Sequence, residues 1–262
     1  MERQAAALSA APPCENLQNF DSFRDESSML PGMTASFPRT VPASDHSVLV
    51  EFGDSIGLDV HTRVHRFFIT MQRHADPCVR NLHPAYTSVL VCFDPDVISQ
   101  AGMTDLIQAR LQRLDTIALP PPRVVEVPVC YAPEFGPDLE LVAKSHGVTG
   151  ADAIRAHTAP EYQVYFLGFS PGFPYLHGLA PQLATPRRTS PRARVAAGSI
   201  AIGGAVTGIY PVASPGGWNL IGRTPLRLFA ADRSPQMQLE IGDCVRFHAI
   251  TRHEFDASER LA

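Results

Sequence analysis

The stretch VYFLGFSPGFPYL, residues 164–176, shows how the second half of this chain is built. Four apolar residues, Val164 to Leu167, run directly into a turn rich in Gly and Pro. Between Tyr162 and Pro235 lie 10 of the 18 Gly and nine of the 24 Pro of the chain. Many short strands separated by such turns predict an all-β sandwich or barrel. The other apolar runs are 200–202, 226–229, 239–241 and 245–247, with Gly242-Asp243 as the turn between the last two.

The first half predicts a mixed α+β domain. Apolar and β-branched runs predict strands at 48–52, 79–83, 88–93 and 125–129, and apolar residues at helical spacing predict helices over 60–71 and 103–114. This β-α-β-β-α-β order is that of a ferredoxin-like fold. Pro128 places the last strand at an edge or near a strand end.

The remaining segments set the domain boundaries. Residues 1–44 are rich in Ala, Ser and Pro, so we expect a disordered tail that is dispensable for stability. An internal start at Met29 or Met33 explains this composition equally well. The ferredoxin-like domain then covers 45–132. Two short helices, the first ended by Gly147 and the second opened by Thr149 with Asp152, form a connector at 133–160. The β domain covers 161–252, and 253–262 form a C-terminal tail.

Composition and charge limit the function classes. A net charge of −4 argues against bulk attraction to nucleic acid or to anionic lipid. The sequence has no run of 18 apolar residues, so we predict no membrane span. It also has no N-terminal apolar h-region, so we predict no signal peptide. The five Cys are odd in number and lack a C-x-x-C pair, which favours reduced thiols over disulfides or a zinc site. We therefore expect a cytoplasmic protein.

Gly168–Gly172 matches the G-x-S-x-G pattern of hydrolase nucleophile elbows. In such an elbow the residue after the serine donates its backbone N–H to the oxyanion, and Pro171 has none. We therefore reject Ser170 as a nucleophile. The aromatic residues of this loop, Phe169, Phe173 and Tyr175, favour packing over ligand contact.

Four arginines, Arg187, Arg188, Arg192 and Arg194, lie within the nine residues 186–194, which also hold two prolines. One interpretation is a solvated basic loop. The other is an anion site, because guanidinium groups bind carboxylate or phosphate through two parallel hydrogen bonds and the prolines lower the cost of ordering the loop. On this second hypothesis Arg187 and Arg192 converge on one anion and act in catalysis, with Arg188 as a further ligand contact.

The segment Ser214–Trp218 contains the pair Gly216-Gly217. Paired glycines can direct successive N–H groups toward one oxyanion or phosphate, although a plain turn explains them as well. Arg223 and Thr224 follow within reach of the same loop end. Among the histidines, His157 is the candidate acid or base, although a lone His is usually structural. His177 and His248 are weaker candidates.

Several segments in this order closely resemble one known family, called carboxyltransferase subdomain C/D or allophanate hydrolase subunit 1. The resemblance covers about residues 45–250, and it adds Ser199 as a candidate ligand contact. One departure is Ala196, where the family usually has Pro. The segments are 127–131, 134–139, 168–176, 186–192, 198–202, 208–211, 214–218 and 222–225.

The resemblance implies a ferredoxin-like domain followed by a cyclophilin-like β-barrel. It also implies one component of an ATP-dependent 5-oxoprolinase, which opens 5-oxo-L-proline to L-glutamate. The expected partners are a companion carboxyltransferase A/B-type protein, which is the C subunit of 5-oxoprolinase, and the lactam-utilisation protein, which is the A subunit. Mg-ATP would act in the assembled complex, and no metal or covalent cofactor is expected on this chain. Two alternatives remain, half of a biotin-dependent carboxyltransferase of the urea carboxylase type and a non-catalytic inhibitor of a histidine kinase.

Overall fold

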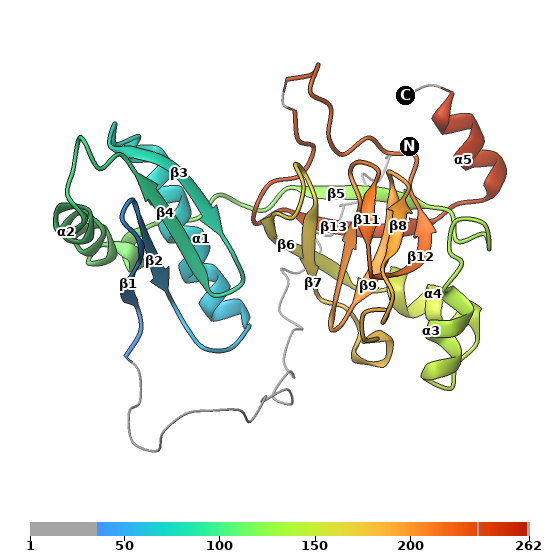
Figure 1. Ribbon diagram of the computed structural model, residues 1–262. Helices are drawn as coiled ribbons and strands as arrows, with labels where there is room; N and C mark the ends of the chain where they lie inside the picture. Colours follow the sequence, from blue (N-terminus) through green and yellow to red (C-terminus); the bar gives the residue numbers. More distant parts are fainter. Residues whose placement is uncertain (1–35, 235, 261–262) are drawn as a thin grey trace, which may run out of the picture. The chain divides into compact units, whose positions relative to one another are not determined.

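A computed structural model describes residues 36–234 and 236–260 of the chain (Figure 1). Within these ranges a four-stranded sheet precedes a seven-stranded sheet, and a two-stranded sheet lies beside the second. The helices in the same ranges are all too short or too polar to span a membrane. Most of residues 1–44, predicted as a tail, lie outside the described residues.

The four-stranded sheet is antiparallel throughout. Its strands lie in the order β1 (Arg39–Ser44), β2 (Ser47–Glu51), β4 (Ser88–Phe93) and β3 (Val79–Pro84). The helices α1 (Leu58–His74) and α2 (Gln100–Leu111) contribute apolar side chains to the core of this sheet, and a short 3-10 helix, η1 (Leu114–Thr116), follows α2. The helical spacing found in the sequence is confirmed, because Val64, Phe67 and Met71 of α1 are all buried.

The ferredoxin-like order predicted for this domain is wrong in two strands. The segment at 125–129 forms β5 (Val124–Val129), but β5 joins the seven-stranded sheet. Its expected place beside β2 is taken by β1, which comes from the segment predicted as a tail. The residue pattern does not predict β1, because none of its residues is buried and Pro42 interrupts it. Both features are typical of an edge strand.

The seven-stranded sheet is curled. Just after β5, Cys130 forms an antiparallel bridge with Arg223 at the end of β12, with N···O distances of 2.8 and 3.0 Å. The two edges of the sheet therefore meet, and the strands form a partly closed barrel (Figure 1). The pair β13–β5 is parallel and the others are antiparallel. The order is β12 (Asn219–Arg223), β9 (Ser199–Gly203), β10 (Val206–Ile209), β7 (Pro174–His177), β6 (Glu161–Leu167), β13 (Cys244–Ala249) and β5.

Strand residues alternate between the two faces of this curled sheet. Ile200 and Ile202 of β9 point into the main core, whereas Ala201 packs on the opposite face with Tyr210 and Trp218. The two-stranded sheet of β8 (Arg192–Val195) and β11 (Ser214–Gly216) contributes Val195 to this second cluster. The barrel therefore has a packed interior and an apolar patch on its outer face.

Two predicted strands are absent from the described residues. The runs 226–229 and 239–241 form loops, and the isolated bridge in this region joins Phe229 to Met237, which lies outside both runs. Leu228 and Leu239 are nevertheless buried, so these runs are apolar because they cover the core. The turn at Gly242-Asp243 is confirmed, with a φ of 89° at Gly242.

The helices around the barrel were predicted only in part. The two short helices predicted within 133–160 are confirmed as α3 (Leu139–Ser145), followed by Gly147 at φ 68°, and α4 (Gly150–Thr158) with a Thr149–Asp152 capping box. Their buried hydrophobic residues belong to the core of the barrel. A short 3-10 helix, η2 (Pro181–Leu183), follows β7. The predicted C-terminal tail is instead α5 (Arg252–Glu259), which is anchored by the fully buried Phe255.

The placement of β1 leads to a prediction about truncation. A chain that begins at Asp45 should melt at a lower temperature than one that begins at Ser36, because only the shorter chain lacks the β1 ladder and exposes the edge of β2. We expect a difference of about 2–4 °C for each kcal/mol of stability lost. Thermal unfolding of the two chains measures it, and identical melting temperatures would mean that β1 adds nothing to stability.

Candidate functional site

The arginine-rich loop is organised around a carboxylate of the protein itself. Arg188 Nη1 and Arg192 Nη2 donate to Asp138 Oδ1 at 3.1 and 2.8 Å. Asp138 Oδ2 accepts the backbone N–H of Leu220 in β12 at 2.7 Å. The Asp138 side chain is only 6% exposed. A buried carboxylate just before α3 therefore ties two loop arginines to the curled sheet.

This arrangement differs from the hypothesis that Arg187 and Arg192 converge on one bound anion. Two guanidinium groups do converge, but they belong to Arg188 and Arg192, and the anion is Asp138. Removing one partner of a buried ion pair is strongly destabilising. Loss of activity in an Arg192→Ala variant would therefore report on folding as much as on ligand binding.

Arg187 is the member of this group that remains available. Its side chain is exposed, and it forms no ion pair with any residue in the described ranges. Its guanidinium carbon lies 5.6 Å from the centre of the Trp218 ring, within the range of a cation–π contact. Arg194, two residues after Arg192 on β8, is exposed as well. The loop thus divides into two structural arginines and two that face solvent.

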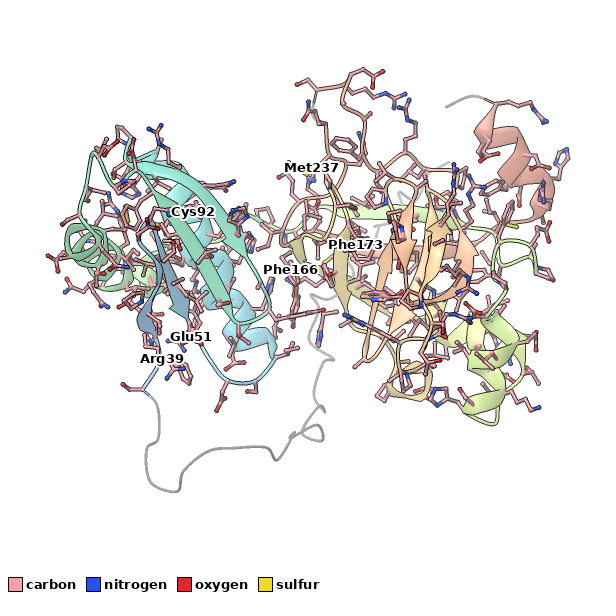
Figure 2. The ribbon with its side chains drawn as sticks, viewed as in Figure 1. Arg39, Glu51, Cys92, Phe166, Phe173 and Met237 are labelled. Atoms are coloured by element: carbon pink, nitrogen blue, oxygen red, sulfur yellow. The ribbon has the colours of Figure 1, made fainter. Side chains whose placement is uncertain are left out.

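Below Arg187 lies a group of rings that we call the aromatic cluster. Phe173, labelled in Figure 2, precedes β7 and contacts all four other members, with ring centres 5.1 to 5.5 Å apart. Most of these pairs are edge-to-face, the arrangement that aromatic quadrupoles favour. The cluster consists of Phe169, Phe173, Tyr175, Tyr210 and Trp218.

The two tyrosines of the cluster are neutral donors. Burial raises the pKa of Tyr175 and of Tyr210 above the usual value for a phenol, and the positive charge of Arg187 opposes this shift in both. Both hydroxyl groups therefore keep their protons at neutral pH. Tyr175 is partly exposed, whereas Tyr210 is only 2% exposed, so Tyr175 is the donor that a ligand can reach.

Gly168–Gly172 connects β6 to β7 as a hairpin loop, which agrees with the rejection of a nucleophile elbow. The loop holds Phe169 at a φ of 66°, a left-handed conformation that is uncommon for a bulky residue. Phe169 is also 63% exposed, although its ring edge contacts Phe173 and Tyr210. An exposed phenylalanine in a strained backbone conformation is typical of a functional position.

The predicted anion nest at Gly216-Gly217 is wrong. Neither glycine has a positive φ, which such a nest requires. Gly216 is needed for a different reason, because a Cβ there would lie 2.8 Å from Cζ of Tyr210. At Gly217 the nearest neighbour of a Cβ would be Pro191 at 3.6 Å, an ordinary contact. The pair therefore serves close packing on the aromatic cluster.

The other predicted ligand residues are dispersed. Arg223 donates from Nε to the carbonyl of Ala197 and pairs with Glu259 at 3.2 Å. Thr224 and Ser199 are buried, and Thr224 Oγ1 accepts from the N–H of Leu226. Only Ser214 remains of interest, because its buried hydroxyl has no hydrogen-bond partner.

His157 lies in the core of the barrel domain and is fully buried. Thr207 Oγ1 donates to the carbonyl of Ala201 at 2.9 Å, so it accepts from Nε2–H of His157 at 3.2 Å. The His157 Nδ1 atom is then unprotonated and accepts from the Tyr131 hydroxyl at 2.8 Å. Burial lowers the pKa of His157 to about 3. This geometry is that of a structural histidine and does not support the predicted role as acid or base.

The sequence did not single out Asp138 or Tyr210 as functional residues. Both lie in segments that carried the family resemblance, 134–139 and 208–211. In a sequence, an isolated Asp before a helix is interpreted as a helix N-cap, and an isolated Tyr is interpreted as a core residue. Only the fold shows that Asp138 is the counter-ion of the arginine loop and that Tyr210 packs against Phe169 and Phe173.

The two glycines lead to a matched prediction. Gly216→Ala should destabilise the chain by about 1–3 kcal/mol, because the added Cβ displaces the packed Tyr210 ring. Gly217→Ala should change stability by less than about 0.5 kcal/mol. Urea unfolding of both variants measures the difference, and equal losses would contradict the packing role of Gly216.

A second prediction concerns pH. The folded-state pKa of His157 lies below its unfolded value of about 6.5, so its neutral form contributes stability that is present above pH 6.5 and is lost as the pH falls toward 3. Below pH 6.5 the free energy of unfolding should fall less steeply in His157→Gln than in the wild type, by up to about 1.4 kcal/mol per pH unit. His61 and His65, whose pKa values burial lowers to about 3 and about 4, titrate in the same window in both proteins.

Urea unfolding between pH 7.5 and 4.5 measures these slopes. The exposed His83→Gln is the matched control and should keep the wild-type slope. NMR of the wild-type imidazole checks the same point without a substitution. A His157 ring that is protonated at pH 5 in the folded protein would contradict it.

Comparison with known proteins places this architecture in a family. A family model described as "Carboxyltransferase domain, subdomain C and D" matches residues 38–239, which include β1. The chain is 39% identical over 223 residues to the B subunit of 5-oxoprolinase from Bacillus subtilis, and this alignment covers 81% of this chain and 93% of that protein.

Solved structures show the same fold. The crystal structure of the protein TTHA0988 superposes with a TM-score of 0.70 at 34% identity, over 79% of this chain and 40% of that one. The urea amidolyase of K. lactis superposes with a TM-score of 0.67 over 88% of this chain and 16% of that one, but at 22% identity it supports the fold alone. The chain belongs to the family of carboxyltransferase domains, subdomains C and D.

Proposed function

We propose that this chain is the B subunit of an ATP-dependent 5-oxoprolinase, which opens the lactam of 5-oxo-L-proline to L-glutamate. The observation that carries this proposal is the match to the B subunit of a bacterial 5-oxoprolinase along 93% of that protein's length. We include in the proposal a cytoplasmic location and the two expected partners, the lactam-utilisation protein (the A subunit) and the carboxyltransferase A/B-type protein (the C subunit). The proposed fold names are a ferredoxin-like variant and a cyclophilin-like barrel.

The chemistry requires more than this chain offers. A lactam is a poor electrophile, and phosphorylation of its carbonyl oxygen by ATP would convert that oxygen into a leaving group. Such a transfer needs fixed positive charge and donors at the reacting atoms. Of the predicted catalytic residues, Arg192 is held by Asp138 and His157 is buried and hydrogen-bonded, so among the described residues only Arg187 remains available. We therefore assign this chain to substrate binding within the complex.

The candidate site has few groups that could bind the phosphates or the magnesium ion of Mg-ATP. Triphosphates are usually held by successive backbone N–H groups in a nest, and Gly216-Gly217 does not form one. Within residues 36–234 and 236–260, no three His, Cys, Asp or Glu side chains come together as candidate metal ligands. We therefore propose that the nucleotide site of the complex is formed mainly by the two partner proteins.

Reconstitution tests this function. The full chain mixed with the lactam-utilisation protein and the carboxyltransferase A/B-type protein should release L-glutamate from 5-oxo-L-proline only when ATP is present. Omission of this chain should abolish release, and this chain alone should release none. The matched control is a complex in which the exposed Arg113, in the four-stranded domain, is changed to Ala and activity persists. A complete, folded complex that forms no glutamate would refute the proposal, and turnover by the chain alone would refute the shared site.

A further inference from the structure

Arg187 differs from its neighbours in what it can bind. The other two arginines assigned to the predicted anion site point at Asp138, whereas Arg187 is exposed and has no acidic partner among the described residues. It is held near the barrel surface by its contact with Trp218. A guanidinium group without a counter-ion above buried rings is suited to a ligand that carries one negative charge and an apolar body.

The surroundings of Arg187 supply the other contacts that such a ligand needs. The Trp218 ring beneath Arg187 lies 5.7 Å, between ring centres, from Tyr175, which is partly exposed. Burial raises the pKa of Tyr175, so its hydroxyl keeps the proton that it can donate to a carbonyl oxygen. The buried Tyr210 contacts Phe169, whose exposed ring is held on the same cluster by the left-handed turn. A cation, a neutral donor and an exposed ring thus lie around the aromatic cluster on the outer face of the barrel.

We propose that Arg187 and the aromatic cluster bind 5-oxo-L-proline itself. The carboxylate pairs with the Arg187 guanidinium, the lactam carbonyl accepts from the Tyr175 hydroxyl, and the five-membered ring lies against Phe169. This inference rests on the proposed function and adds the location of the substrate. It assigns Arg187, Tyr175 and Phe169 as binding residues, with Asp138 as a positioning residue that engages Arg188 and Arg192.

The same observations disfavour a nucleotide at this point. ATP carries several negative charges, whereas Asp138 engages Arg188 and Arg192, and Arg187 is the loop arginine that lies over a ring of the aromatic cluster. Gly216-Gly217 does not form a nest, so its backbone N–H groups do not converge to bind a phosphate. A single carboxylate on a small ring is therefore the better match.

The chain contains a built-in reporter of this site, because Trp218 is its only Trp. The first experiment titrates the full chain with 5-oxo-L-proline and follows the fluorescence of Trp218. We expect a saturable change that 2-pyrrolidinone, the same ring without the carboxylate, does not produce. Arg187→Ala should weaken binding by about 10- to 100-fold, the usual effect of losing a hydrogen-bonded charge. Arg187→Lys should restore only part of it, because an ammonium group lacks the fork.

The second experiment measures steady-state kinetics in the reconstituted complex. Arg187→Ala should raise KM for 5-oxo-L-proline by a similar factor and leave KM for ATP within about twofold, since only one substrate contacts Arg187. The matched control is Arg194→Ala, which removes an exposed arginine nearby and should leave both KM values near the wild type. Melting temperatures show whether each variant is folded.

The outcomes separate this inference from the proposed function. An unchanged KM for 5-oxo-L-proline in a folded Arg187→Ala complex would overturn the proposed substrate site. Glutamate formation by the same complex would still support the proposed function. A fluorescence response to Mg-ATP that requires Arg187, without one to 5-oxo-L-proline, would also overturn it in favour of a nucleotide. A wild-type complex that forms no glutamate would refute the function, and the titration would then still decide whether Arg187 binds this ring acid.

Discussion

The carboxylate of Asp138 is the interaction on which the arrangement of this site depends. It accepts two guanidinium groups and the backbone N–H of Leu220, so it joins the start of α3, the strand β12 and the arginine loop. A buried charge is tolerated only when it is paired and hydrogen-bonded, and Asp138 is both. Because Arg188 and Arg192 are fixed in this way, the loop between them has a defined path, and Arg187 at its start faces the aromatic cluster.

The second constraint is the two-sided character of the barrel sheet. The side chains of β9 alternate, with Ile200 and Ile202 in the core and Ala201 on the outer face. The small Ala201 side chain leaves room for the larger rings packed over that face. A sheet that buries one face in a barrel and packs aromatic residues on the other can present a polar group above an apolar floor. Arg187 over Trp218 is such an arrangement.

Much of the local structure was predictable. The helical spacing in 60–71, the capping box at Thr149 and Asp152, and the Gly147 terminus all depend on residues close together in sequence, and all are confirmed. The predictions that failed depended on distant partners. Strand β1 forms only because β2 has an open edge, and β5 leaves its expected sheet because β13 pairs with it in parallel.

The site shows the same division between local and distant information. By itself the sequence determined that four arginines lie in one Pro-stiffened loop, that Gly216-Gly217 adjoins the single Trp, and that Pro171 excludes a serine elbow, because these are properties of neighbouring residues. Only the tertiary structure decided which arginine is available, since Asp138 lies 50 residues before Arg188 and 54 before Arg192. It also decided that His157 is structural, because Thr207 meets its ring across 50 residues of chain. Charge pairing and burial are set by contacts in space, and residue order does not encode them locally.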